Sequence, residues 1–209
     1  MNQNAQNTPD GLRRRLRQQR SALPDSDRSR GALLMRGRLY TWLATRRSAL
    51  IEQGRPPPRH IAAFWALPDE PDLQGLLRQW AMDEELSVSL PAVAGPAQPL
   101  QFRLWTPETP LHPGPYGILE PDGPPAPAPD VILVPTLGFT RQGDRIGYGG
   151  GYYDRTLAAL QASGQAFVSV GIAWASGDLS QMGHQPQTHD IRLDAVLTDK
   201  GWALKAPEP

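Results

Sequence analysis

The sequence predicts an α/β protein, in which short strands and helices alternate along one chain. Three observations support this class. Apolar runs of strand length alternate with segments of helical spacing from residue 61 onward. The run from Val131 to Val134 is apolar throughout, which is typical of a strand buried on both faces. A glycine-rich segment then lies between that strand and a helix, where open α/β sheets bind ligands.

Two helices are predicted before the first strand. The stretch from Leu12 to Leu23 is rich in arginine, repeats leucine at helical spacing and is closed by Pro24, which is the pattern of an amphipathic basic helix. The second helix ends before the loop from Gly54 to Pro58, and we expect its apolar face to pack on a sheet. That face carries Ala32, Met35, Leu39, Trp42 and Leu43.

The other elements follow in alternation. Strands are expected at Ile61 to Ala66, Leu86 to Leu90, Leu100 to Trp105, Val131 to Val134, Phe167 to Ala173 and Ala195 to Thr198, and helices at Asp72 to Glu84 and Tyr152 to Ala162. Two proline-rich segments, residues 107–115 and 121–129, are expected to be connections within the domain. The rhythm favours an α/β sandwich that forms a single domain over residues 1–209, and it leaves open whether residues 1–10 are ordered.

Composition excludes several classes of function. The 21 basic and 21 acidic side chains cancel, so no global charge favours a nucleic acid or an anionic membrane as partner. The absence of cysteine excludes disulfides, thiolate nucleophiles and cysteine-ligated metals, and it fits a reducing compartment. No apolar run approaches the roughly 20 residues of a membrane helix, and the first ten residues are polar. We expect a soluble cytoplasmic protein, with no nucleic-acid or membrane partner.

The segment from Gly143 to Arg155 is the most informative part of the sequence. Its glycines allow free turns and bring bare N–H groups, backed by a helix N-terminus, against phosphate oxygens. Arg145 would add a charge-assisted contact, and Asp154 in the first helical turn could hold Mg²⁺ between nucleotide phosphates. The Gly-Lys-Ser/Thr ending of a Walker loop is absent. From the residues alone, a phosphate site and a tight connection both remain open.

Val134-Pro135, Phe139, Gly143, Arg145 and the run Gly147-Tyr148-Gly149-Gly150-Gly151-Tyr152-Tyr153-Asp154-Arg155 resemble the signature of the 5-formyltetrahydrofolate cyclo-ligases. The similarity covers nearly the whole chain. It extends to Leu12-Arg13, Arg20, Asp69-Glu70, Leu90-Pro91, Gly117-Ile118, Glu120-Pro121, Val170 to Ala173 and His189-Asp190.

The resemblance implies a three-layer α/β/α sandwich with a mostly parallel central sheet, of the type shared with sugar-phosphate isomerases and CoA transferases. It implies ATP-dependent cyclisation of 5-formyltetrahydrofolate to 5,10-methenyltetrahydrofolate, through a phosphorylated formyl oxygen and with release of ADP and phosphate. ATP is then the co-substrate and Mg²⁺ the cofactor, both substrates share one cleft, and we expect a monomer. No protein nucleophile is needed, and the sequence shows no Gly-x-Ser-x-Gly elbow and no cysteine.

The resemblance also implies roles for individual residues. Arg145 and Tyr152 would be catalytic, Trp65, Glu70 and Tyr152 would bind the pterin, and Asp154 and Asp190 would hold magnesium. The ATP site would be built by Arg13, Arg145, Ile146, Gly147, Tyr148, Gly149, Gly150, Gly151, Tyr152 and Tyr153.

Simpler interpretations of these residues stay open. Without the family, Arg13 is a solvated charge, Glu70 a helix-capping carboxylate, Trp65 a core residue and Asp190 part of a loop turn. His184 and His189 are near Asp190 in the sequence, but four scattered histidines without an HExxH pattern do not indicate a zinc site.

Three positions depart from the family pattern and leave alternatives open. Pro9 stands where many members have a lysine or arginine, Thr140 stands where they have an aspartate, and the stretch from Trp174 to Gly177 lacks a usual glutamine. Arg14 or Arg15 could replace the charge lost at Pro9. The alternatives are a non-catalytic or altered-substrate relative that binds folate or nucleotide, and an RNA-binding module led by the arginine-rich helix, which explains only the first 25 residues.

Overall fold

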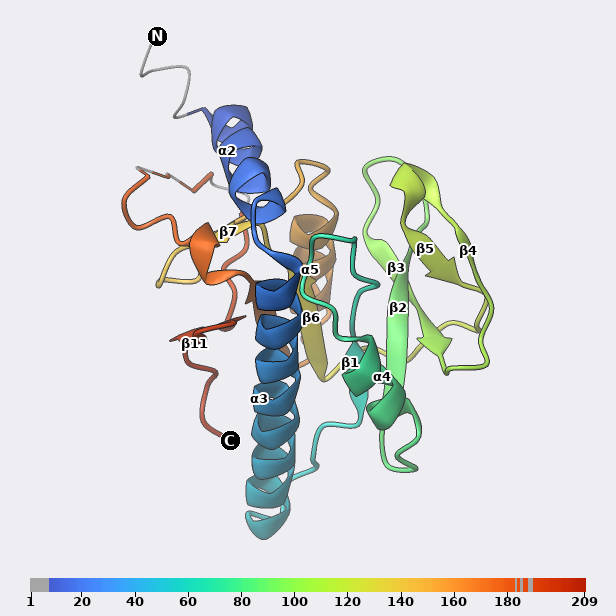
Figure 1. Ribbon diagram of the computed structural model, residues 1–209. Coiled ribbons are helices and arrows are strands. Elements are labelled where there is room, and N and C mark those ends of the chain that lie inside the picture. Colours follow the sequence, from blue (N-terminus) through green and yellow to red (C-terminus); the bar gives the residue numbers. More distant parts are fainter. Residues whose placement is uncertain (1–7, 183, 185, 188–189) are drawn as a thin grey trace, which may run out of the picture.

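The structure is a computed structural model that describes residues 8–182, 184, 186–187 and 190–209. A seven-stranded sheet runs through the molecule in the order β11-β10-β9-β6-β1-β2-β3 (Figure 1). Its strands are β1 (His60–Ala62), β2 (Ser87–Val93), β3 (Leu100–Trp105), β6 (Val131–Pro135), β9 (Val168–Ala173), β10 (Ala195–Thr198) and β11 (Gly201–Leu204). The five inner strands are parallel, and β3 and β11 pair antiparallel at the two edges.

Helices cover both faces of the sheet, which confirms the predicted mostly parallel sheet between helical layers. The helices are α2 (Pro9–Ser21), α3 (Asp25–Glu52), α4 (Gln74–Ala81) and α5 (Tyr152–Ala162). In Figure 1, α3 and α4 lie in front of the sheet and α5 lies behind it. One apolar cluster joins the α3 and α4 face to the sheet around Met35, Leu39 and Leu133, and a second joins α5 through Leu157 to Ile132 and Val134.

The order of the strands creates a switch point next to β1. The chain moves from β1 to β2 on one side of the sheet, and later places β6 and β9 on the other side. Ligands bind in open α/β sheets at such a point, beyond the carboxyl ends of the strands. Here β1 leads into residues 63–73 and β6 leads into residues 136–144, so both connections begin at this end of the sheet.

Thr8 is the N-cap of α2, and its side-chain oxygen accepts a hydrogen bond from Gly11 N at 3.2 Å. Pro9 occupies the first turn of α2, where its missing N–H costs nothing. Of residues 1–10, whose order the sequence leaves open, residue 8 caps the helix and residues 9 and 10 are helical, while residues 1–7 lie outside the described residues. The buried residues Leu12 and Leu16 attach α2 to a third apolar cluster with Leu137, Ile146 and Leu179.

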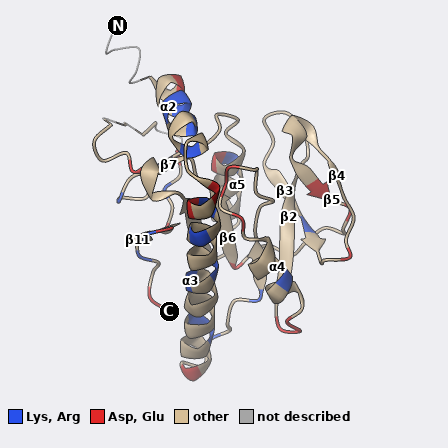
Figure 2. Ribbon diagram, in the orientation of Figure 1, with Lys and Arg blue, Asp and Glu red and all other residues tan. Residues whose placement is uncertain are grey.

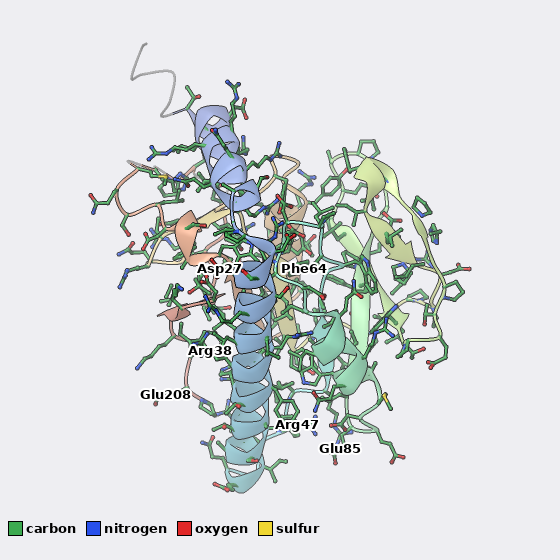
Figure 3. All side chains as sticks on the ribbon, in the orientation of Figure 1. Asp27, Arg38, Arg47, Phe64, Glu85 and Glu208 are labelled. Carbon is green, nitrogen blue, oxygen red and sulfur yellow. The ribbon has the colours of Figure 1, made fainter. Side chains whose placement is uncertain are left out.

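Polar contacts and the apolar core hold α3 in place. Arg47 of α3 pairs with Glu85 beyond α4, and Figure 3 shows the two side chains at the same end of the helix. Arg38 donates to the backbone oxygen of Asp199 at 3.0 Å, which ties the helix to the turn after β10. Among the residues that the structure describes, no helix is long and apolar enough to span a membrane.

The sequence placed most elements correctly. The predicted helix from Tyr152 to Ala162 and the predicted strands from Leu100 to Trp105 and from Ala195 to Thr198 agree with the structure residue by residue. The first strand was predicted too long, because the ladder ends at Ala62 and the chain then turns through Pro68. The helix predicted from Asp72 to Glu84 begins at Gln74, because the Asp72 side chain accepts from Gln74 N at 2.8 Å.

Several short paired strands were not predicted from the sequence. The proline-rich connection contains β4 (Leu111–Pro113) and β5 (Leu119–Pro121), joined by a 3₁₀ turn, η1 (Pro115–Gly117). A second ribbon pairs β7 (Gly138–Phe139) with β8 (Arg145–Ile146). Each of these strands has two or three residues, so none shows the alternation by which a strand is read from sequence. The last strand, β11, was also not predicted; it has four residues, and its pairing with β10 is interrupted by a register shift.

Candidate functional site

A glycine segment, residues 147–151, connects β8 to α5. Gly149 and Gly151 have φ angles of 97° and 65°, which glycine adopts without the steric cost that a side chain would bring. Gly151 is also the N-cap of α5 and provides no side-chain cap. The first N–H groups of α5 therefore keep their capacity to bind an anion, and the helix dipole favours negative charge there.

Basic side chains of α2 face this glycine segment. Arg13 Nε donates to the backbone oxygen of Gly147 at 3.2 Å, and its guanidinium also pairs with Asp10 at 2.7 Å. Arg17 lies over the Tyr148 ring, at 5.7 Å from the centroid. Figure 2 shows the concentration of basic residues along α2. The segment thus receives positive charge from a helix far away in the sequence, since the Arg13 contact spans 134 positions.

A second cation lies near the glycine segment although position 9 is a proline. Arg14 and Arg15, the candidates to replace the missing charge, are exposed. The residue that approaches the glycine segment is instead Arg17, one helical turn beyond Arg13. Sequence reasoning missed it, although the spacing of four residues from Arg13 places both on one side of α2.

Arg145 and Asp154 form a pair inside the site. Arg145 Nη2 lies 2.7 Å from Asp154 Oδ1, and the Arg145 side chain is only 4% exposed. Arg145 also donates to the backbone oxygen of Ile191, and Ile191 N donates to Asp154 Oδ1 at 3.3 Å. These contacts join the strand β8 and the first turn of α5 to the loop before β10, which is 46 positions from Arg145.

Asp154 and Asp190 are the two carboxylates that the sequence named for a magnesium ion. Both hydrogen bonds that Asp154 accepts in the described part of the chain use Oδ1, and Asp190 directly precedes Ile191, which contacts the same oxygen. Asp190 Oδ2 accepts from Gln187 N at 2.8 Å. No group of three or more potential ligands occurs among the described residues. Mg²⁺ typically uses one or two carboxylates together with substrate phosphates and water, so a set of two carboxylates is compatible with that ion.

A buried hydrogen-bond network lies beside the glycine segment. Arg20 holds both carboxylate oxygens of Asp69, at 2.8 and 2.9 Å, and it donates to the Tyr148 hydroxyl. Tyr148 in turn donates to Glu70 Oε1, while Glu70 Oε2 accepts from Leu67 N at 2.8 Å. Burial raises the pKa of Glu70 against the opposing effect of these hydrogen bonds, and burial likewise raises the pKa of Tyr148.

Arg20 was noted in the sequence only as part of the family pattern. Yet Leu12, Leu16 and Arg20 are spaced by four residues, and all three are buried on one face of α2. An arginine on the apolar face of a helix needs a partner, because an unpaired buried charge is strongly unfavourable. That spacing was the signal from which a buried ion pair could have been predicted.

The aromatic candidates lie in two different environments. Tyr152 is partly exposed, its hydroxyl lies 3.2 Å from that of Tyr116, and Arg155 lies over its ring at 4.9 Å. Tyr153 packs against the α5 core cluster, and its hydroxyl is buried without a described hydrogen-bond partner. Trp65 packs against Trp105 with ring centroids 5.8 Å apart, which also agrees with the simpler interpretation of it as a core residue.

The structure therefore brings most of the expected residues together. Glu70 touches Tyr148, Arg13 touches Gly147, and Arg145 touches Asp154. Ile146 contributes to the apolar cluster beneath α2 rather than presenting a polar group. No described contact links Trp65 to the glycine segment. His189, which the family pattern includes, lies outside the described residues, and the described Nε2 of His184 is buried without a hydrogen-bond partner.

The departure at Thr140 has a structural role. Its hydroxyl donates to Asp144 Oδ2 at 3.0 Å and accepts from Asp144 N at 3.1 Å, which closes the turn between β7 and β8. Asp144 also pairs with Arg192 at 2.8 Å. The carboxylate expected at position 140 is thus replaced by a hydroxyl that works with a neighbouring carboxylate. In the stretch that lacks a glutamine, Trp174 donates from Nε1 to the backbone oxygen of Asp69 at 2.8 Å.

Comparisons with known proteins point to one family. The model of the 5-formyltetrahydrofolate cyclo-ligase family matches residues 5–199. A 5-formyltetrahydrofolate cyclo-ligase of Mycolicibacterium smegmatis is 33% identical over 90% of this chain and 92% of its own, and one of Haemophilus influenzae is 30% identical over 71% of this chain and 79% of its own. The solved structure of an Aquifex aeolicus 5,10-methenyltetrahydrofolate synthetase has a TM-score of 0.70 at 24% identity, covering 93% of this chain and 91% of that one.

Proposed function

Since the chain belongs to the 5-formyltetrahydrofolate cyclo-ligase family, we propose that its glycine segment and α2 bind ATP while the neighbouring network around Glu70 faces the folate. Members of this family cyclise 5-formyltetrahydrofolate to 5,10-methenyltetrahydrofolate at the expense of ATP, and this chain is an enzyme of that type. The observation that carries the assignment of the ATP site is the glycine N-cap of α5, which ends a glycine segment that Arg13 contacts at Gly147 and precedes Asp154, the partner of Arg145.

The chemistry requires activation of a poor leaving group. The formyl oxygen on N5 takes the γ-phosphoryl group of ATP, and ADP is released. N10 then attacks the formyl carbon, the C–O bond to phosphate breaks, and loss of the N10 proton leaves the cationic methenyl bridge. The protein supplies positioning and charge stabilisation for these steps. Backbone N–H groups of residues 147–151 and the guanidinium of Arg13 would hold the phosphates.

Asp154 and Asp190 would hold the magnesium ion, which neutralises phosphate charge when it is bound. Arg145 would act at the same place by positioning the magnesium ligands rather than by binding phosphate with a free guanidinium. Its guanidinium is nearly buried and holds Asp154 and Ile191, so it fixes the first of the two carboxylates and the loop that carries the second. Any contact of Arg145 with phosphate would use its remaining N–H groups.

The folate side of the proposal rests on Glu70, Tyr152 and Trp65. Glu70 already accepts two hydrogen bonds, so it would meet the pterin with its remaining lone pairs. Tyr152 offers a partly exposed ring at the start of α5, and Trp65 would contribute an apolar surface next to Trp105. All residues assigned to ATP, folate and magnesium belong to one chain, so the proposal requires no second subunit. We place the enzyme in the cytoplasm, because a cysteine-free chain fits a reducing compartment.

The direct test follows methenyl formation by its near-ultraviolet absorbance, with purified protein, 5-formyltetrahydrofolate, ATP and Mg²⁺. Arg13→Gln should raise the KM for ATP by about tenfold to a hundredfold, as expected for a lost hydrogen bond to a charged group. Arg15→Gln is the matched control on the exposed side of α2 and should leave the KM unchanged. Wild-type protein that binds ATP or folate by calorimetry without turnover would instead identify a non-catalytic relative. If Arg13→Gln leaves the KM for ATP as unchanged as Arg15→Gln does, the assignment of α2 to the ATP site is wrong.

The RNA-binding alternative is not supported by the packing of α2. Arg13 and Arg20 are directed to the glycine segment and to the buried network, and Leu12 and Leu16 are covered by the domain. A salt-sensitive affinity for RNA in the same preparation would revive it.

A further inference from the structure

We propose that Arg20 is a positioning residue that couples the nucleotide half of the site to the folate half, because its guanidinium holds Asp69 and the Tyr148 hydroxyl together while Tyr148 donates to Glu70. The inference rests on the proposed function, which assigns the glycine segment to ATP and Glu70 to folate. It adds an energetic link between the two sites, in which Arg20 itself touches neither substrate.

Arg20 is buried and contacts two segments, unlike an arginine in a surface ion pair. Its side chain is 7% exposed, and its three nitrogen atoms are directed to two different segments. Two of them form a bidentate pair with Asp69, in the connection after β1. The third donates to Tyr148, in the glycine segment before α5. A bidentate guanidinium fixes both distance and orientation, which an ammonium group does not.

Tyr148 transmits the position of one segment to the other. Its hydroxyl accepts from Arg20 and donates to Glu70 Oε1, so one oxygen atom joins the cation to the carboxylate. The ring is also covered by the guanidinium of Arg20, at 5.4 Å from its centroid. Glu70 has a side-chain exposure of 5%, so it moves only if its partners move with it. Any displacement of residues 147–151 on binding phosphates is therefore transmitted to Glu70 through Tyr148.

Asp69 connects the Arg20 network to the end of β9. The backbone oxygen of Asp69 accepts from Trp174 Nε1 at 2.8 Å, at the carboxyl end of β9. The network thus spans the ends of β1 and β9 and the connection into α5. Its members are satisfied by one another, as buried polar groups must be, so loss of one hydrogen bond rearranges its neighbours.

The prediction is a thermodynamic coupling between the two ligands. In wild-type protein, a saturating non-hydrolysable ATP analogue with Mg²⁺ should tighten the binding of 5-formyltetrahydrofolate by about tenfold, which is within the usual range for coupled sites. Tyr148→Phe keeps the ring and removes only the hydroxyl, and it should reduce this factor to about twofold or less. Arg20→Lys keeps the charge and loses the bidentate geometry, and it should reduce the factor in the same direction.

The experiment measures folate affinity by calorimetry with and without the analogue, for wild type, Tyr148→Phe, Arg20→Lys and the control Tyr40→Phe. Tyr40 is an exposed tyrosine on α3, so its variant should show the wild-type factor. Thermal unfolding identifies any variant that fails to fold, and Tyr148→Phe then carries the test alone. A coupling factor that Tyr148→Phe leaves at its wild-type value, or a wild-type factor near one, overturns the proposal. Absence of turnover in wild type would instead contradict the proposed function itself.

Discussion

Replacing the carboxylate at position 154 by an amide would separate two roles of one side chain. Asp154 Oδ1 accepts from Arg145 at 2.7 Å and from Ile191 N at 3.3 Å. An asparagine there would keep a carbonyl oxygen for both donors and would lose the negative charge. Asp154→Asn should therefore preserve the fold of this region while it weakens the binding of Mg²⁺.

The structure sets the size of both effects. Removing one partner of a fully buried ion pair costs about 3–5 kcal/mol. Asp154 is 24% exposed and the asparagine keeps its hydrogen bonds, so we expect a loss of about 1–3 kcal/mol in the free energy of unfolding. For a chain of this size, that loss lowers Tm by about 2–12 °C. Loss of one of two proposed carboxylate ligands should raise the Mg²⁺ concentration needed for half-maximal activity by about 10- to 100-fold.

The assay is thermal unfolding as a function of Mg²⁺ at a fixed concentration of ATP analogue, together with the Mg²⁺ dependence of turnover. Ligand binding to the native state raises Tm, so the Mg²⁺-dependent part of that increase should be reduced in Asp154→Asn. Asp122→Asn, on the exposed loop after β5, serves as the matched control. An unchanged Mg²⁺ dependence in Asp154→Asn would refute the assignment of Asp154 to the metal, whatever its effect on Tm.

Three further predictions concern the glycine segment, the buried carboxylate and the core. Gly151→Ala and Gly164→Ala both place a side chain at positive φ, so each variant should lose about 1–2 kcal/mol of stability. Only Gly151→Ala should also weaken nucleotide binding. Equal nucleotide affinity in the two variants would exclude the α5 N-terminus from the site. Burial raises the folded-state pKa of Glu70, so the ionised carboxylate is disfavoured in the native state and stability falls as pH rises from the unfolded value through the folded one. The stability of Glu70→Gln relative to wild type, measured by urea unfolding, should therefore increase from pH 4.5 towards neutral pH, and a constant difference would contradict the raised pKa. Leu157→Ala, at a fully buried position of α5, should lose about 2–5 kcal/mol in urea unfolding, and a loss within the error of the method would show that α5 is not anchored there.

The sequence predicted those elements whose patterns are long or sharply bounded. The helix at Tyr152 follows a run of glycines that cannot continue a strand, and β6 has four consecutive apolar residues that are buried on both faces. The ribbons β4–β5 and β7–β8 have no such pattern, because their short strands are defined by pairing with each other. Local sequence does not specify that pairing.

The family pattern named the residues of the candidate site, but it could not give their contacts. The family pattern identified Arg145 and Asp154, but only the fold shows that the two side chains bind each other and Ile191. In the same way, the sequence marked Thr140 as a departure, and the structure shows its hydroxyl closing a turn with Asp144. These contacts join segments through the tertiary structure, and no local rule of spacing encodes them.

The contact between α2 and the glycine segment also has a consequence for the order of folding. Arg13 and Gly147 are separated by 134 positions, and Arg20 and Tyr148 by 128. At about 5–20 residues per second, the glycine segment is synthesised roughly 6–27 seconds after α2. During this interval Leu12 and Leu16 have no native surface to cover them, because their cluster partners Leu137, Ile146 and Leu179 all lie in the second half of the chain. The amino-terminal helix is thus made first and must wait for the second half of the chain before it can take its native place.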